Sequence, residues 1–187
     1  PGNYSAILID GNGCSDSVTF AITQPSAPLE DFIQNKHNVD CFGNANGGLT
    51  GLGTGGTVPY SYSINGGFSY QTSPTFTGLG ATQYTIQIRD ANGCLATVTD
   101  TVASPTGLFG SLIGKKDLRC FGLDDGFIQL EGTGGTQPYD LSLDGSTFFN
   151  SLSLSNLAPG QDTVLLLDAN NCLVSIPFEI FEPSLLT

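Results

Sequence analysis

Apolar and polar residues alternate with a period of two along much of the chain. In a β-strand successive side chains point to opposite faces, so this alternation is typical of strands with one buried face. No stretch sustains the period of about 3.6 residues that marks an amphipathic helix. Proline cannot donate to a β-ladder, so Pro177 predicts an edge strand or a bulge in the last run. The pattern predicts an all-β chain whose alternating apolar positions are Tyr4, Ala6 and Leu8; Val18, Phe20 and Ile22; Tyr60, Tyr62 and Ile64; Tyr84, Ile86 and Ile88; Leu141 and Leu143; Val164 and Leu166; and Val174, Ile176 and Phe178.

Three predicted strand pairs are joined by one kind of turn, here called the cysteine hairpin turn. Its copies are residues 10–14, 90–94 and 168–172, with the sequences Asp-Gly-Asn-Gly-Cys, Asp-Ala-Asn-Gly-Cys and Asp-Ala-Asn-Asn-Cys. Asn and Gly tolerate the positive φ that primed turns require, so we expect tight hairpins with primed turns. Asn171 stands where the other copies have glycine, and Asn is the next-best residue for that conformation.

The cysteine hairpin turns belong to a longer repeat with a period near 79 residues. Cys41-Phe42-Gly43 recurs at residues 120–122, and the glycine-rich stretch 53–60 recurs at 132–139. Such self-similarity marks a tandem array. We predict that residues 1–25 form the C-terminal hairpin of a preceding repeat, and that residues 26–105 and 106–187 are two further repeats.

Each repeat carries short strands at intervals of about 8–12 residues, separated by turn signals. This spacing predicts an Ig-like antiparallel β-sandwich for each repeat. The junctions between repeats are short and contain proline, as in Pro25-Ser26-Ala27-Pro28, so we expect stiff coupling between neighbours.

The amino-acid composition argues against several classes of function. The formal net charge is −12 with only five Lys and Arg, which argues against nucleic acid and against anionic membranes as partners. No apolar run approaches the roughly 20 residues of a membrane span, so we expect no membrane insertion. His37 is the only histidine and no acid–base constellation recurs, so we expect no enzymatic activity. Cysteines at fixed positions in small, loop-rich units indicate an oxidising, extracytoplasmic setting.

The ordered set of motifs resembles the SprB-type repeat. The motifs are Cys-Phe-Gly at 41–43, Gly-Gly-Thr-x-Pro-Tyr at 55–60, the cysteine hairpin turn at 90–94, and a closing proline at 105. That repeat builds very long gliding-motility adhesins on the surface of Bacteroidetes bacteria. The resemblance implies a secreted cell-surface adhesin, exported by the type IX secretion system to the outer side of the outer membrane. It also implies partners in the neighbouring repeats, in the secretion and gliding machinery, and in an external surface or polysaccharide.

The five cysteines allow several pairings. Pairing within repeats joins Cys41 to Cys94 and Cys120 to Cys172, and leaves Cys14 unpaired. Pairing between sequence neighbours joins Cys14 to Cys41 and Cys94 to Cys120, and leaves Cys172. In a stack of Ig-like sandwiches, however, Cys41 would lie nearer to Cys172 of the following repeat. Counting does not choose among these.

The cysteine hairpin turns also resemble the first half of an oxygen-rich calcium loop. Such a loop needs about six to eight oxygens and a closing bidentate carboxylate, which the apolar residues after each cysteine do not supply. We therefore favour turns capped by their own aspartates, with calcium as the one cofactor to test. The candidate ligands are Asp10, Asn12, Asp90, Asn92, Asp168 and Asn170.

The function that these observations favour is a structural and adhesive segment that acts as a stiff stalk. The rival is a carbohydrate- or ligand-binding module whose site lies in the irregular segments 68–76 and 146–154, and which a glycan array would reveal. Its candidate contacts are Phe68, Tyr70, Phe148 and Phe149, although such residues more often pack in cores or loops. A second rival is an accessory region of a secreted enzyme.

Overall fold

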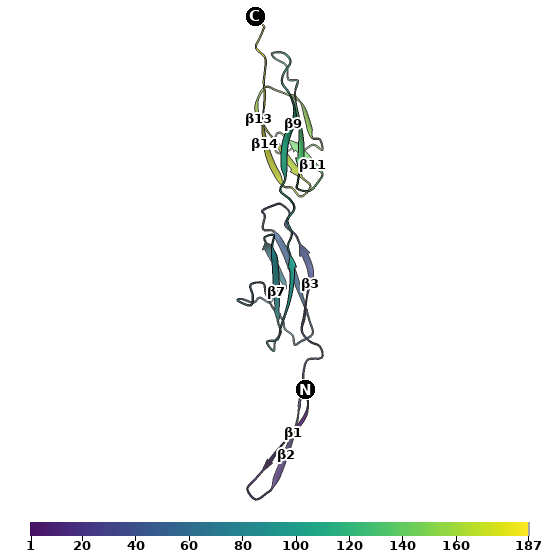
Figure 1. Ribbon diagram of the computed structural model, residues 1–187, viewed down its shortest axis with the longest axis vertical. Coiled ribbons are helices and arrows are strands. Elements are labelled where there is room, and N and C mark those ends of the chain that lie inside the picture. Colours follow the sequence, from purple (N-terminus) through teal and green to yellow (C-terminus); the bar gives the residue numbers. More distant parts are fainter. Residues whose placement is uncertain (187) are drawn as a thin grey trace. The chain divides into compact units, whose positions relative to one another are not determined.

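The computed structural model describes residues 1–186, and the prediction of an all-β chain is confirmed, because these residues contain no helix (Figure 1). Accordingly, no helix of the described part is long and apolar enough to cross a membrane. The strands are β1 (Gly2–Ile9), β2 (Ser15–Ile22), β3 (Glu30–His37), β4 (Gly47–Thr54), β5 (Ser61–Ser63), β6 (Thr75–Leu79), β7 (Gln83–Arg89), β8 (Leu95–Thr101), β9 (Phe109–Lys116), β10 (Gly126–Thr133), β11 (Tyr139–Ser142), β12 (Ser153–Leu157), β13 (Gly160–Asp168) and β14 (Leu173–Ile180).

The same strand plan occurs twice. Strands β3 to β8 form two sheets with the orders β3-β4-β6 and β5-β7-β8, and strands β9 to β14 form two with the orders β12-β10-β9 and β11-β13-β14. Numbered within each copy, these are sheets of strands one, two and four and of strands three, five and six. That is the division of an Ig constant-type sandwich with strands A, B and E facing C, F and G, and without strand D. The chain therefore contains tandem Ig-like β-sandwiches.

The structure divides into two compact units. The first comprises residues 1–35, 50–75 and 84–100, and the second comprises residues 36–49, 76–83 and 101 onwards. The division passes through the stretch 26–105, so the repeat boundaries given above stay a prediction.

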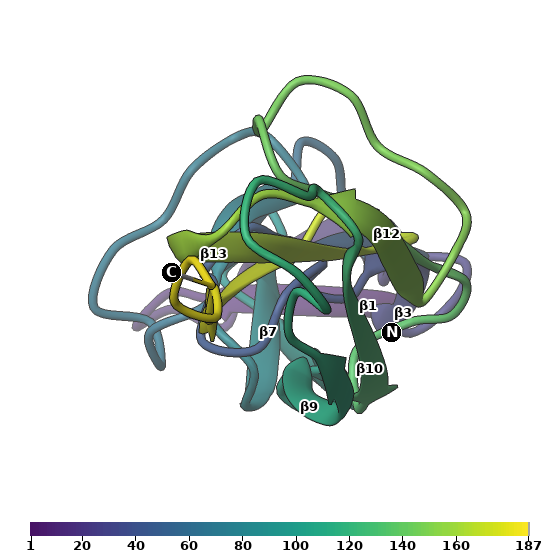
Figure 2. The ribbon, with the colours of Figure 1, turned by 90° about the horizontal axis from the view of Figure 1, so that it is seen from above.

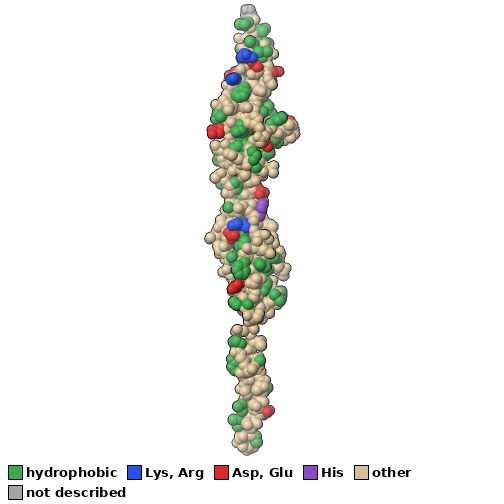
Figure 3. Space-filling model, turned by 90° about the vertical axis from the view of Figure 1, so that its right-hand side faces the viewer, with side chains coloured by type: hydrophobic (Ala, Val, Ile, Leu, Met, Phe, Trp, Pro, Cys, Tyr) green, Lys and Arg blue, Asp and Glu red, His purple; other side chains and the backbone are tan. Residues whose placement is uncertain are grey.

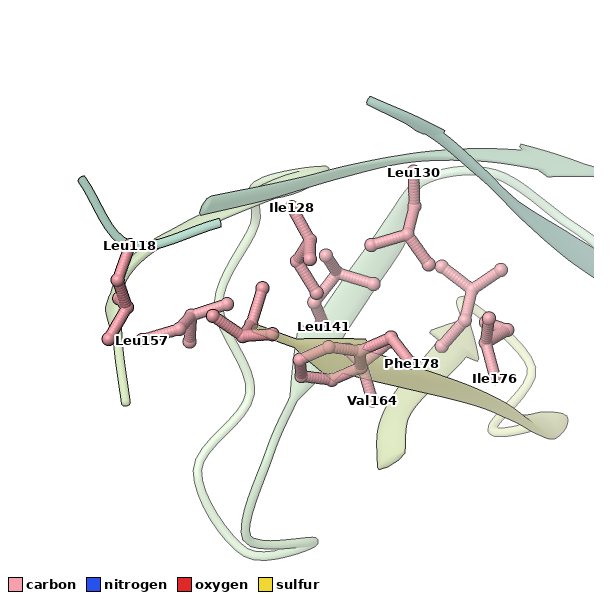
Figure 4. Packing of buried hydrophobic residues seen from close by; sticks show 10 residues of the cluster. Leu118, Ile128, Leu130, Leu141, Leu157, Val164, Ile176 and Phe178 are labelled. Carbon is pink, nitrogen blue, oxygen red and sulfur yellow. The ribbon is translucent and has the colours of Figure 1, made fainter. Parts of the chain in front are cut away.

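In the second unit a continuous core lies between the two sheets. Figure 2 shows β9 and β10 together, apart from β13 of the other sheet. Alternate side chains point inward in β14 and in β13 from Val164 onwards, and Figure 4 shows these side chains meeting those of β10 and β11. The buried cluster is Leu118, Ile128, Leu130, Leu141, Leu157, Val164, Leu166, Ile176, Phe178 and Ile180. Burial of this set is the main stabilising term, at about 1.5–3 kcal/mol for each large side chain.

The alternation located most of this core, with one error. Leu141 is fully buried, but Leu143 is 37% exposed, because β11 ends at Ser142 and the chain turns away there. Pro177 lies opposite Thr163 on β14, which is an edge strand of its sheet, as predicted.

In the first unit, β1 and β2 form an antiparallel hairpin from Gly2 opposite Ile22 to Ile9 opposite Ser15 (Figure 1). Tyr4 and Phe20 stack on one face with ring centroids 6.0 Å apart. The apolar side chains of both strands are exposed, so among the described residues nothing covers this hairpin. An isolated two-stranded ribbon is only marginally stable in water, so packing against another element would stabilise this hairpin.

The surface carries few charges. On the face in view in Figure 3, Lys and Arg side chains are sparse and most of the surface is backbone or uncharged polar groups. This agrees with the chain's five Lys and Arg against 17 Asp and Glu.

Asp31 on β3, in the first unit, has a buried carboxylate group. Both of its carboxylate oxygens are buried, and within the described residues neither has a hydrogen-bond partner of good geometry. Burial raises the pKa of Asp31 to about 6, and the backbone amides of Phe32 and Val98 offset this only in part. Compared with the unfolded chain, the folded chain therefore favours the protonated form of the Asp31 carboxyl group.

We expect Asp31→Asn to stabilise the chain at pH 7 and to change little at pH 4. With a folded pKa above the unfolded value of about 4, the stability contributed by Asp31 is present below pH 4 and lost as pH rises through about 6. The gain at pH 7 should be about 1–2 kcal/mol, discounted because the side chain is partly exposed. Thermal melts at both pH values measure it, with Glu30→Gln on the exposed face of β3 as control. An equal gain at both pH values would contradict the argument.

Candidate functional site

The three cysteine hairpin turns adopt one backbone conformation. In the last copy, Asn171 N donates to Asp168 O at 3.0 Å and Asp168 N donates to Cys172 O at 3.0 Å. Only the fourth residue of each turn has a positive φ, namely Gly13, Gly93 and Asn171 at 88°, 85° and 64°. This is a type I turn followed by a left-handed bulge residue, so the predicted primed turn is wrong. At the third position of the turn, the side-chain amides of Asn92 and Asn170 donate to Thr57 Oγ1 and Thr136 Oγ1.

Asp168 holds its turn from inside. Its Oδ1 accepts bonds from the amides of Asn170 and Cys172 at 2.9 and 2.8 Å, and its Oδ2 accepts one from the amide of Thr136 at 2.8 Å. The side chain is only 3% exposed. Three amide donors therefore satisfy the buried carboxylate and fix the position of Cys172.

Asp90 repeats this arrangement in the first unit. Its carboxylate accepts bonds from the amides of Asn92, Cys94 and Thr57 at 2.8–2.9 Å. Burial opposes ionisation, but the amide donors, led by Cys94, outweigh it and hold the pKa of Asp90 below its ordinary value. Asp10 makes the two bonds within its own turn, to the amides of Asn12 and Cys14, and is exposed.

The glycine-rich stretches form the seat for these turns. Gly134 has φ of 70°, and an added Cβ there would lie 1.9 Å from Gly107 O, so only glycine fits. The next residues bring Thr136 N to Asp168 and Thr136 O to the amide of Ala169. The sequence shows that the stretch 132–139 is repeated, but it does not indicate that Thr136 in this stretch supplies the third amide donor to Asp168.

The Cys-Phe-Gly turns are also alike. Asp40 N donates to Asn46 Oδ1 at 3.1 Å, and in the second copy Arg119 N donates to Asp125 Oδ1 at 3.2 Å. Side-chain pairs reinforce both turns, with Asn46 Nδ2 bonded to Asp40 Oδ2 and Arg119 paired with Asp125. The residue six positions after the anchored amide was not identified from sequence, since it is Asn in one copy and Asp in the other.

One disulfide joins a Cys-Phe-Gly turn to a cysteine hairpin turn within the second unit. Cys41 and Cys172 are bonded with a Cα–Cα distance of 5.6 Å, across a sequence separation of 131 residues. Asn170 Nδ2 donates to Asp40 O at 3.2 Å beside it, while also donating to Thr136 Oγ1 at 3.1 Å. Cys172 is 9% exposed. The disulfide therefore joins the predicted repeat of residues 26–105 to the predicted repeat of residues 106–187.

The other cysteines are free and exposed: Cys14, Cys94 and Cys120. The structure therefore forms neither the pairs within repeats nor the pairs between sequence neighbours. The geometry of the second repeat explains why Cys120 does not meet Cys172. The turn of Cys172 lies beside Leu108, before β9, whereas Cys120 follows β9. Eight strand residues separate these ends by about 26 Å.

The candidate calcium residues are brought into turns but not into a cation cage. Each copy directs backbone amides at its Asp carboxylate, and Asn92 and Asn170 use their side-chain amides as donors. In residues 1–186 no three His, Cys, Asp or Glu side chains gather in a way that could hold a metal ion.

We expect a calcium chelator to leave the melting temperature unchanged, because the carboxylate oxygens already accept amide hydrogens. Melts with and without chelator, and with added calcium, measure this. If the chelator lowered the melting temperature by more than about 2 °C, this would contradict the prediction and indicate a calcium site.

The candidate ligand-binding aromatics differ in their contacts and in their exposure. Tyr70 donates to Gln87 Oε1 at 2.6 Å and lies under the Arg89 guanidinium at 4.0 Å. Phe149 pairs through its backbone with Leu141. Phe68 alone among the four is almost fully open, at 96% exposure. His37 lies on the surface, 3.4 Å from Asp40 Oδ1.

Comparison with known families agrees with this arrangement. The family described as "SprB repeat" matches residues 33–68 and 115–148. These two stretches of the chain are similar to the SprB repeat. The two matches start within β3 and β9 and end after β5 and β11. They therefore cover equivalent parts of the two copies of the strand plan, and they include Cys41 and Cys120. The resemblance predicted from the motif order is confirmed.

No curated protein matches the chain. Among solved structures, the three N-terminal domains of the Highly Immunogenic Outer Capsid protein (Hoc) of bacteriophage RB49 match over 82% of this chain with 13% identity and a TM-score of 0.47. Sidekick-1 immunoglobulin domains 1–4 match over 98% with 12% identity and a TM-score of 0.36. A tetra-tandem repeat in the extending region of a large adhesion protein matches over 96% with 15% identity and a TM-score of 0.26. The chain spans between 56% and 59% of the length of each.

Proposed function

We propose that this chain is a load-bearing repeat segment of a large secreted cell-surface adhesin, and that its SprB repeats carry tension without catalysing a reaction. The observation that supports this most strongly is the Cys41–Cys172 disulfide. Exported proteins keep such bonds, whereas cytosolic thiols are held reduced.

The bond has a direct mechanical consequence. Strands β4 to β13 all lie between Cys41 and Cys172 in sequence, while β1, β2, β3 and β14 lie outside. Tension applied to the two ends of the chain passes from residue 41 to residue 172 through the disulfide. The ten strands inside the loop are therefore shielded from unfolding by that tension.

The wider context of the proposal is adhesion in gliding motility. The SprB repeats support a surface location and export by type IX secretion, and neighbouring repeats of the same chain are the immediate partners. Of the four candidate aromatics of the ligand-binding alternative, Phe68 is 96% exposed and Phe149 is 53% exposed, whereas Tyr70 is held by Gln87 and Arg89. A stalk role accounts for the repeated turns and the disulfide together.

Single-molecule pulling from the two ends tests the proposal. We expect the oxidised chain to release about 45 nm less contour length than the reduced chain, because 131 residues at ~3.5 Å each stay inside the loop. The Cys41→Ser variant, pulled without reductant, should match the reduced chain. Equal contour lengths for the oxidised and reduced chains would contradict a load path through this bond.

A further inference from the structure

Cys94 lies in a turn that already has the geometry of the bonded one. The Asp90 carboxylate collects the amides of Asn92, Cys94 and Thr57, as Asp168 collects those of Asn170, Cys172 and Thr136. Asn92 Nδ2 donates to Thr57 Oγ1 at 2.9 Å, as Asn170 Nδ2 does to Thr136 Oγ1. Asn170 makes one bond more, to Asp40 O of the Cys-Phe-Gly turn across the joint.

Cys120 lies in the complementary turn. Its neighbour Arg119 is anchored to Asp125 through the same backbone bond that anchors Asp40 to Asn46. Leu123 N donates to Cys120 O, as Asn44 N does to Cys41 O. Cys94 and Cys120 thus lie in turns that are equivalent to the two halves of the Cys41–Cys172 joint.

Cys94 and Cys120 each also border a surface hollow. Cys94 borders one of about 500 Å³, with the proline-rich residues 24–29 and Leu95. Cys120 borders one of about 430 Å³, with Phe121 and residues 183–186. In the formed joint the equivalent of Cys94 is the buried Cys172, whereas Cys94 itself is exposed. The difference between the two equivalent cysteines is the presence of a partner turn.

We propose that Cys94 and Cys120 are junction cysteines that bind further SprB-type repeats covalently. Cys94 forms a disulfide with the cysteine of a Cys-Phe-Gly turn in a preceding repeat that is in register. Cys120 forms a disulfide with the cysteine of a cysteine hairpin turn in a following repeat that is in register. The inference rests on the formed joint within this chain and not on the adhesive role.

The chemistry of each junction is thiol oxidation. Two thiols form one S–S bond and release two protons and two electrons, and a small-molecule disulfide such as oxidised glutathione accepts them to become two thiols. Because Cys120 lies inside the loop closed by Cys41 and Cys172, each new bond would start within the preceding loop. Successive loops would overlap, and no whole repeat would be left free to lengthen under tension.

An extended chain tests this. Residues 106–187 are appended directly after Pro183, the counterpart of Pro105, so that the added copy follows in register. After refolding with a glutathione couple, iodoacetamide labels free thiols and non-reducing peptide mass spectrometry maps the bonds. We expect a peptide linking Cys120 to the Cys172 copy of the added repeat, and at least a tenfold fall in labelling of Cys120 relative to the original chain.

The matched control carries Cys172→Ser in the added copy only, and should return Cys120 to full labelling. Labelled Cys120 in the extended chain, with the Cys41–Cys172 peptide present, would overturn the proposal in a folded and oxidised sample. A sample with neither bond would overturn it as well, because the Cys41–Cys172 joint is its template. Failure here would leave the pulling result on the original chain unaffected.

Discussion

Replacing Cys41 and Cys172 together by serine is expected to lower the free energy of unfolding by about 4–5 kcal/mol. The disulfide closes a loop of 131 residues, and the loss of chain entropy that such a loop imposes on the unfolded state corresponds to about 5 kcal/mol at 25 °C. Because native domains are stable by only about 5–15 kcal/mol, this loss is a large share of the total. Urea unfolding of the oxidised chain and the double variant measures it.

The control for this prediction is the double variant Cys94→Ser and Cys120→Ser. Both thiols are free and exposed, so the change should stay within about 0.5 kcal/mol. If the two double variants unfold at the same urea concentration, the Cys41–Cys172 bond contributes nothing to stability in solution.

Asp168→Ala should be the most damaging substitution of a polar residue, at about 3–5 kcal/mol. It leaves the amides of Asn170, Cys172 and Thr136 without their acceptor in a buried site, and each unpaired donor costs about 1–3 kcal/mol. It also releases the turn that presents Cys172, so formation of the Cys41–Cys172 bond should slow. Chemical unfolding and the rate of thiol loss on oxidation are the two measurements.

Two matched variants separate hydrogen bonding from a general effect of the turn. Asp168→Asn keeps an oxygen for two of the three amides and should cost less than the alanine variant. Asp10→Ala alters the same turn where it is exposed and water replaces the lost bonds, so its cost should stay below about 1 kcal/mol. Equal losses at Asp10 and Asp168 would show that burial is not the cause.

Much of the fold was predictable because the sequence repeats and alternates. The inward positions of β7, β13 and β14 follow from period-two patterning, which buried positions such as Ile86, Val164 and Ile176 obey. Leu143 did not follow it, since a strand's end is set by the turn after it and not by alternation. The turn type was also missed, because Asn-Gly serves both primed turns and type I turns with a bulge.

The site was only partly predictable. Cysteine counting does not give the pairing of Cys41 with Cys172, but stacking Ig-like sandwiches end to end does place these two cysteines near each other. The donors Thr57 and Thr136 are more than 30 residues from the aspartates they bind, so local spacing does not reveal them. The capping of each turn by its own aspartate was visible, because that contact is local.

The proposed function depends most on the covalent joint that Cys41 and Cys172 form between the two repeats. Non-reducing peptide mass spectrometry of the oxidised chain, with free thiols alkylated beforehand, tests it most directly. The structure predicts one linked peptide pair containing Cys41 and Cys172, with Cys14, Cys94 and Cys120 alkylated. Linked peptides joining Cys41 to Cys94 and Cys120 to Cys172 would contradict it.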